Sequence, residues 1–201
     1  MANLTDYITY KPSAIAVSQA DFDDLWRLWD KIEYTPNPLN KKYMIKRKQA
    51  TFGGQYNFAG QVSNQFPLES NEWPTIVKEV LQVTRVMSGS ESYNVVHVNW
   101  YPDGSAGLEP HSDDLRKNVP GMDIYSYTLL SQPGNPRGFQ VYKKSAEKGT
   151  GELIKEYSLD HGDLVVMTTE MQEKFKHGVK KSSAKRFKDL KRINMTVRAW
   201  V

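Results

Sequence analysis

The sequence contains no cysteine among its 201 residues. A chain without cysteine forms no disulfide and offers no thiolate to a metal, so a metal site must use histidine, aspartate or glutamate. The chain also lacks an apolar run of the roughly 18 to 20 residues that a membrane span needs. Its first residues show neither the basic start nor the apolar stretch of a secretory signal. We therefore expect an intracellular protein, cytoplasmic or nuclear, that is not secreted and has no membrane partner.

Positive charge is in small excess and is unevenly distributed. The formal net charge is +4, which is a weak indication of an anionic partner. One basic cluster lies within residues 41–48 and a second within residues 174–192. Such clusters are typical either of solvated loops or of a surface that binds nucleic acid.

Two helices are expected in the first half of the chain. Residues 19–31 carry one apolar stripe, formed by Phe22, Leu25, Trp26 and Trp29. Ser18 and Asp21 resemble a capping box before it. A second helix is expected over 74–86, with Pro74 at its first position.

From residue 93 onward the sequence predicts strands. Short runs rich in β-branched and aromatic residues alternate with turn residues, at 93–101, 124–130, 137–143, 153–159, 163–169 and 192–200. Helices followed by many short strands predict an α+β protein, a β-sandwich with helices on one side. The length favours one domain, which we expect to be monomeric. About residues 1–90 would hold the helices, and about residues 91–201 the strands of the core.

The last predicted strand has one polar face. Side chains alternate along a strand, so Arg192, Asn194, Thr196 and Arg198 share one side. Two guanidinium groups with an amide and a hydroxyl between them suit a small dianion. The alternative is an edge strand whose polar face lies in water.

Three residues could hold a metal ion. His111 and Asp113 point the same way in an extended segment, and His177 could complete a set of two histidines and one carboxylate. His-x-Asp is common by chance, so the pair alone is weak evidence. We expect His97 to be structural, because it lies within an alternating strand, and His161 to be a turn residue.

The chain resembles AlkB-family dioxygenases. The resemblance covers about residues 36–200 and rests on the order and spacing of four motifs, Asn99-x-Tyr101-x-x-Gly104, His111-x-Asp113, His177 and Arg192-x-Asn194-x-Thr196-x-Arg198. The segments RKQATFG (47–53), HSDD (111–114), LDHGDLVVM (159–167) and RINMTVR (192–198) look most like the branch that repairs alkylated bases in DNA.

The resemblance implies a fold and a cofactor set. The fold is a distorted double-stranded β-helix, or jelly roll, with N-terminal helices and a nucleotide-recognition lid. The cofactors are Fe(II), 2-oxoglutarate and O2, with His111, Asp113 and His177 as catalytic iron ligands. The implied 2-oxoglutarate-binding residues are Asn99, Tyr101, Arg192, Asn194 and Arg198.

The resemblance also implies a substrate and a set of substrate-binding residues. The reaction would be oxidative demethylation of N-alkylated bases in DNA or RNA, giving succinate, CO2 and formaldehyde. Asp114 would contact the base, and Arg47, Tyr56 and Phe58 would line its pocket; Asp114 could instead be a solvated carboxylate, and the two aromatics could pack the lid. Leu39 lies where the branch that repairs duplexes carries an intercalating aromatic, although an exposed loop leucine is the simpler interpretation.

One departure from the family pattern leaves the substrate open. The repair branch usually has glutamate after the second aspartate, and this chain has Leu115. The alternative function is a 2-oxoglutarate-dependent hydroxylase of a protein or small molecule. A non-catalytic binding module would be expected to have lost a metal ligand, and a zinc hydrolase would have no use for the face of Arg192 and Arg198.

Overall fold

The computed structural model describes residues 3–37, 42–54, 57–58, 61–62, 64–66, 72–145 and 151–201. Most of its strands form two mainly antiparallel sheets. The larger sheet has seven strands in the order β1 (Ile8–Lys11), β11 (Leu164–Met167), β8 (Ile124–Leu130), β13 (Arg192–Arg198), β6 (Val95–Tyr101), β2 (Lys48–Phe52) and β5 (Asn64–Gln65). The smaller has four, in the order β10 (Leu153–Leu159), β9 (Arg137–Lys143), β12 (Phe175–Val179) and β7 (Leu108–His111).

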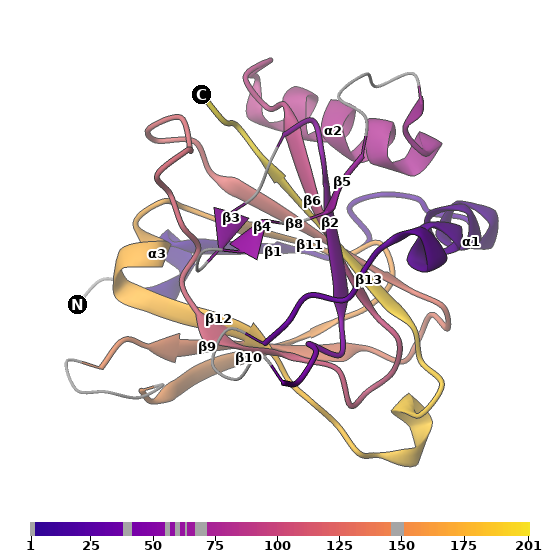
Figure 1. The fold of residues 1–201 in the computed structure, drawn as a ribbon. Helices are drawn as coiled ribbons and strands as arrows, with labels where there is room; N and C mark the ends of the chain where they lie inside the picture. The colour runs from indigo at the N-terminus through magenta and orange to yellow at the C-terminus, as the bar shows by residue number, and fades with distance from the viewer. Residues whose placement is uncertain are drawn as a thin grey trace.

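The remaining elements are short, except for two helices. The helices are α1 (Gln19–Trp26), α2 (Thr75–Ser88) and α3 (Met171–Lys174), with 3-10 turns η1 (Leu4–Asp6), η2 (Arg27–Lys31) and η4 (Lys185–Phe187). A small hairpin pairs β3 (Asn57–Phe58) with β4 (Gln61–Val62). In Figure 1, α2 and α1 lie on one side of the large sheet, and β9, β10 and β12 lie on the other. Among the described residues, no helix is long and apolar enough to cross a membrane.

Both predicted helices form, with shifted ends. The first is α-helical only to Trp26 and continues as η2. Its predicted capping box is present: the Ser18 side chain accepts from the backbone N–H of Asp21, and the Asp21 side chain accepts from that of Ser18. Pro74 is the N-cap of α2 and not its first helical residue. The C-cap of that helix is Gly89, whose left-handed φ of 67° suits a residue without a Cβ.

The two faces of β13 and β6 serve different purposes. Ile193, Met195 and Val197 belong to the main apolar cluster under α1 and α2, as do alternate residues of β6. The polar residues of both strands point to the other side, toward the small sheet. The alternative of an edge strand facing water is therefore excluded, because β13 lies between β8 and β6 and all seven of its residues are buried.

The first half of the chain contributes more than helices and a lid. Strands β1, β2 and β5 join the same sheet as the later strands. Strand β2 pairs with β6 along its whole length, from Lys48 opposite Trp100 to Phe52 opposite Val96. The large sheet therefore combines residues from both halves, and β2 brings Arg47 and Gln49 to the same side as the polar face of β13.

Candidate metal centre and adjoining cavities

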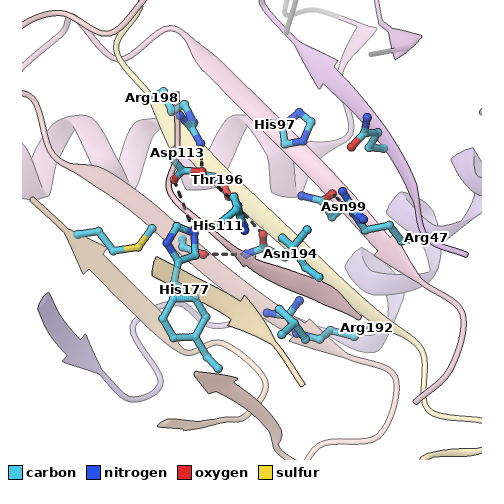
Figure 2. A pocket seen from close by; sticks show the side chains of 16 residues that line it. Arg47, His97, Asn99, His111, Asp113, His177, Arg192, Asn194, Thr196 and Arg198 are labelled. Atoms are coloured by element: carbon cyan, nitrogen blue, oxygen red, sulfur yellow. Dashed lines mark hydrogen bonds and ion pairs between the residues drawn. The ribbon is translucent and has the colours of Figure 1, made fainter. Parts of the chain in front are cut away.

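The three predicted metal ligands meet between the two sheets. His111 ends β7, His177 lies opposite it on β12, and Asp113 follows two residues after His111. One potential ligand atom of each residue lies within 4.8 Å of those of the other two. The Nε2 atoms of His111 and His177 are 3.5 Å and 3.8 Å from the Asp113 carboxylate oxygens. Figure 2 shows the three side chains converging at one end of the pocket.

A close approach of two backbones brings the histidines together. A Cβ on Gly178 would lie 2.6 Å from the carbonyl oxygen of Leu108, so a larger residue beside His177 would push β7 away. The two imidazole rings have centroids 4.5 Å apart. Phe139 stacks on the ring of His177 from β9 at 5.5 Å.

Hydrogen bonds orient the ligand atoms. Nδ1 of His111 lies 3.0 Å from the carbonyl oxygen of Glu109, to which it can donate, leaving Nε2 to face the other two residues. The backbone N–H of Asp113 donates to the side chain of Gln172 at 2.9 Å. These contacts hold the segment after β7 against α3.

The electrostatics of the site favour the forms that bind a metal. Burial lowers the pKa of His177 to about 3, so its imidazole is neutral and can offer a lone pair. Burial alone would raise the pKa of Asp113, but the positive charge of Arg198 holds it well below its usual range. Nη2 of Arg198 lies 3.0 Å from the Asp113 carboxylate. The donor set therefore consists of one carboxylate and two imidazoles, which suits Fe(II).

The polar face of β13 lines the same cavity, of about 60 Å³. Arg192, Asn194, Thr196 and Arg198 all contribute to its wall, together with Asn99 from β6. Asn194 donates to the hydroxyl of Ser126 at 2.8 Å, and Arg192 donates to Thr128 at 3.0 Å. The remaining nitrogens of Arg192, Nε and Nη1, are buried and make no hydrogen bond with any described residue. A buried guanidinium with donors to spare suits the distal carboxylate of 2-oxoglutarate.

Tyr101 lies behind this wall. Its ring is fully buried, and the Arg192 guanidinium carbon lies 5.0 Å from the ring centroid. It is not among the residues that line the cavity. The structure thus places Tyr101 against Arg192, and its direct contact with 2-oxoglutarate stays a prediction.

A second cavity of about 470 Å³ adjoins the first. Both are lined by Arg47, Gln49, Leu108 and His111. Nε of Arg47 donates to the Asn99 side chain at 3.0 Å, at the boundary between them. The outer cavity also has charged residues in its wall, namely Lys46 and Lys181, the latter in an ion pair with Glu109. Of the two predicted substrate-binding residues whose side chains the structure describes, Arg47 lines it and Asp114 does not.

Asp114 and Leu115 take positions that the sequence did not indicate. Arg116 holds the carboxylate of Asp114 through several contacts, the shortest 2.5 Å from Nη2 to Oδ2. Asp114 lines neither cavity. Leu115 packs against a second apolar cluster that includes Phe139 and Ile124. The position of the family glutamate is therefore occupied by a side chain that packs into the core.

Three predicted positions lie beyond what can be described. Leu39 and Tyr56 are outside the described residues, and for Phe58 only the backbone, in β3, is described.

Two histidines were expected to have no part in the site. His161 is a turn residue, as predicted, with backbone contacts to Leu130 and Val17. His97 is buried but lines the inner cavity, where Nδ1 lies 3.1 Å from the Thr51 hydroxyl. Its spacing of two from Asn99 was the signal that could have placed it there.

Comparisons with known proteins agree with this geometry. A family model described as the 2OG-Fe(II) oxygenase superfamily matches residues 23–198. The DNA oxidative demethylase ALKBH2 of Mus musculus is 28% identical over 168 residues, covering 76% of this chain and 65% of the relative. The Homo sapiens protein of that name is 26% identical over 167 residues, covering 76% and 60%. This chain thus spans less than two thirds of either relative's length.

Two solved structures share the fold. OsALKBH1 matches with a TM-score of 0.57 and 17% identity, over 95% of this chain and 97% of that one. A prolyl hydroxylase from Trichoplax adhaerens, in complex with a peptide of hypoxia inducible factor, matches with a TM-score of 0.60 and 13% identity, over 98% and 84%. Both likenesses concern the fold alone, and they confirm the predicted jelly roll.

Proposed function

The chain belongs to the 2OG-Fe(II) oxygenase superfamily, as an AlkB-type dioxygenase that uses Fe(II), 2-oxoglutarate and O2, and from this premise we propose that it demethylates N-alkylated bases in nucleic acid. The observation that carries the proposal is the outer cavity, which reaches the metal centre at His111 and has Lys46, Arg47 and Lys181 in its wall. A cavity with cations beside a metal site suits a nucleotide, whose base enters while its phosphate stays at the rim.

The surface near this cavity supports the same partner. Lys181 lies in the connection between β12 and β13, which carries further exposed cations at Lys185, Arg186, Lys188 and Lys191. Phe187 and Leu190 anchor this connection in an apolar cluster with Leu130. Cations held on an anchored segment can contact successive phosphates of one strand.

Each residue of the inner cavity has a role in this proposal. His111, Asp113 and His177 bind the iron, and Arg198 fixes the Asp113 carboxylate. Arg192 pairs with the distal carboxylate of 2-oxoglutarate, and Asn99 donates to the same molecule. Asn194, whose amide donates to Ser126 and to the Tyr127 carbonyl, contributes to the wall of the pocket. With iron, 2-oxoglutarate and O2 bound, the site would supply the oxidation of an N-methyl group, whose carbon would be released as formaldehyde while 2-oxoglutarate becomes succinate and CO2. Arg47 donates to Asn99 and lines the outer cavity as well, so it is in contact with both cavities.

The test is a panel of oligonucleotides carrying 1-methyladenine or 3-methylcytosine, as single and double strands of DNA and RNA. We expect formaldehyde release and the matching loss of mass on at least one of them. Asp114→Asn tests whether this carboxylate leaves Arg116 to contact the cationic base: if it does, demethylation should fall more than 2-oxoglutarate decarboxylation without substrate.

A second candidate function is hydroxylation of a protein or small molecule. Two observations favour it: Arg116 occupies the Asp114 carboxylate, and Leu115 packs into the apolar core. Neither residue is then available to a cationic base. Absence of demethylation on every oligonucleotide, together with hydroxylation of a peptide or metabolite, would replace the first proposal by this one.

A further inference from the structure

A second buried arginine lies near Arg192. Arg137, at the start of β9, is 1% exposed. Among the described residues, its guanidinium donates to backbone carbonyls alone: Nη2 to Ala106 and Lys180 at 2.9 Å, and more weakly to Gly104 at 3.5 Å, and Nη1 to Asp103 at 3.3 Å. The side chain thus crosses from the small sheet to the loop that follows Tyr101 at the end of β6.

The two arginines form a buried cluster of positive charge. No described carboxylate makes an ion pair with either of them. Burial and the neighbouring Arg192 lower the pKa of Arg137 to about 10, so it is still charged at neutral pH. Burial also lowers the pKa of Arg192. Two like charges out of water, whose hydrogen bonds go to backbone carbonyls and to the Thr128 hydroxyl, are costly unless an anion joins them.

We propose that Arg137 is a positioning residue for 2-oxoglutarate, supplying a second positive charge behind Arg192 that selects the distal carboxylate. It does not line the inner cavity, so it acts through its charge and through the loop it holds. Arg192 makes the direct contact, with Nε and Nη1 available to it. This inference rests on the family's use of 2-oxoglutarate and not on the nucleic-acid substrate, so the two proposals fail independently.

Geometry explains how Arg137 acts on the pocket. It fixes the carbonyls of the loop directly after Tyr101, whose ring lies against the Arg192 guanidinium. It also binds the carbonyl of Lys180, one residue beyond β12, the strand that carries His177. One side chain thereby joins β6, β9 and β12 at the end of the cavity formed by Arg192.

The experiment measures binding without turnover, with Mn(II) in place of Fe(II). Calorimetry gives dissociation constants for 2-oxoglutarate and for 2-oxopentanoate, which keeps the 2-oxo acid group and lacks the distal carboxylate. We expect Arg137→Gln to weaken 2-oxoglutarate binding about tenfold, since a charge acting through partly polar surroundings has an effect of this order. Binding of 2-oxopentanoate should change less than about twofold. Arg137→Lys keeps the charge and should retain most of the preference for the dicarboxylate.

A matched control separates this role from simple anchoring. Arg85 also donates to a backbone carbonyl, that of Tyr93 at 2.9 Å, but from α2 on the opposite side of the large sheet. Arg85→Gln should lower the melting temperature and leave the ratio of the two constants unchanged. The proposal is overturned if Arg137→Gln, shown by circular dichroism to be folded, keeps the wild-type ratio or weakens both ligands equally. If the Gln variant does not fold, Arg137→Lys decides the question. A folded Arg137→Lys that no longer prefers 2-oxoglutarate to 2-oxopentanoate, although it keeps the charge, also overturns the proposal.

Discussion

At the scale of single residues, the four histidines differ in what their nitrogens contact. Those of His161 are turned toward backbone atoms of Leu130 and Val17. Those of His111 and His177 include an Nε2 within 4 Å of the Asp113 carboxylate. His97 lines the inner cavity, so its substitution cannot serve as a control outside the site. Metal binding should thus depend on two of the four.

We expect His111→Ala, Asp113→Ala and His177→Ala each to abolish turnover of 2-oxoglutarate, because each removes one of three ligands. His161→Gln should cost about 1–3 kcal/mol of stability through lost backbone contacts and retain turnover. Succinate formation and Fe(II) binding under anaerobic conditions measure the difference. Wild-type turnover in any of the three alanine variants would contradict the ligand assignment.

Leu115 provides a second prediction at this scale. The family pattern suggests that Leu115→Glu would restore a substrate contact, but the side chain is partly buried and packs against the second apolar cluster. A carboxylate there loses apolar contacts and is partly desolvated, so we expect a loss of about 1–3 kcal/mol. Urea denaturation measures it. A stable variant with changed lesion preference would show that the residue faces the substrate.

At the scale of elements, the two faces of β13 can be separated by mutation. Arg192→Met removes the cation proposed to meet the distal carboxylate, and 2-oxoglutarate should bind about 30-fold or more weakly, as for a buried pair that loses one partner. Met195→Ala, on the opposite face, should cost about 2–5 kcal/mol of unfolding free energy and leave the affinity nearly unchanged. Calorimetry and urea titration distinguish them; equal effects on affinity would contradict the division of faces.

The same scale shows what the sequence could predict. Strands with regular β-branched runs were predicted within two residues, and β8, β9 and β10 at their observed ends. Strand β7 was not predicted, because it has four residues and contains Pro110, which suits its edge position. The alternation of β13 predicted the polar wall of the cavity. Nothing local in the sequence marked Arg137, because its role depends on a loop more than 30 residues away.

At the scale of the whole molecule, cations gather on the connection between β12 and β13. If this surface contacts phosphates, neutralising Lys185 and Lys188 together should reduce the slope of log affinity against log salt by about 1.4–1.8, since each contact contributes about 0.7–0.9. A matched double variant at Lys31 and Lys78, on the helical side, should keep the wild-type slope. Fluorescence anisotropy of an oligonucleotide over a salt series measures both. Equal slopes in the two variants would place the contact elsewhere.

The central position of β13 has a consequence for the lifetime of the protein in a cell. Strand β13 lies in the middle of the large sheet and also carries Arg192, the residue proposed to bind the distal carboxylate of 2-oxoglutarate. A ligand that binds only the folded chain stabilises it in proportion to the logarithm of its concentration over its dissociation constant. Scarcity of 2-oxoglutarate therefore increases the fraction of unfolded chains, which proteases degrade. The abundance of this protein should follow the metabolic supply of its own co-substrate.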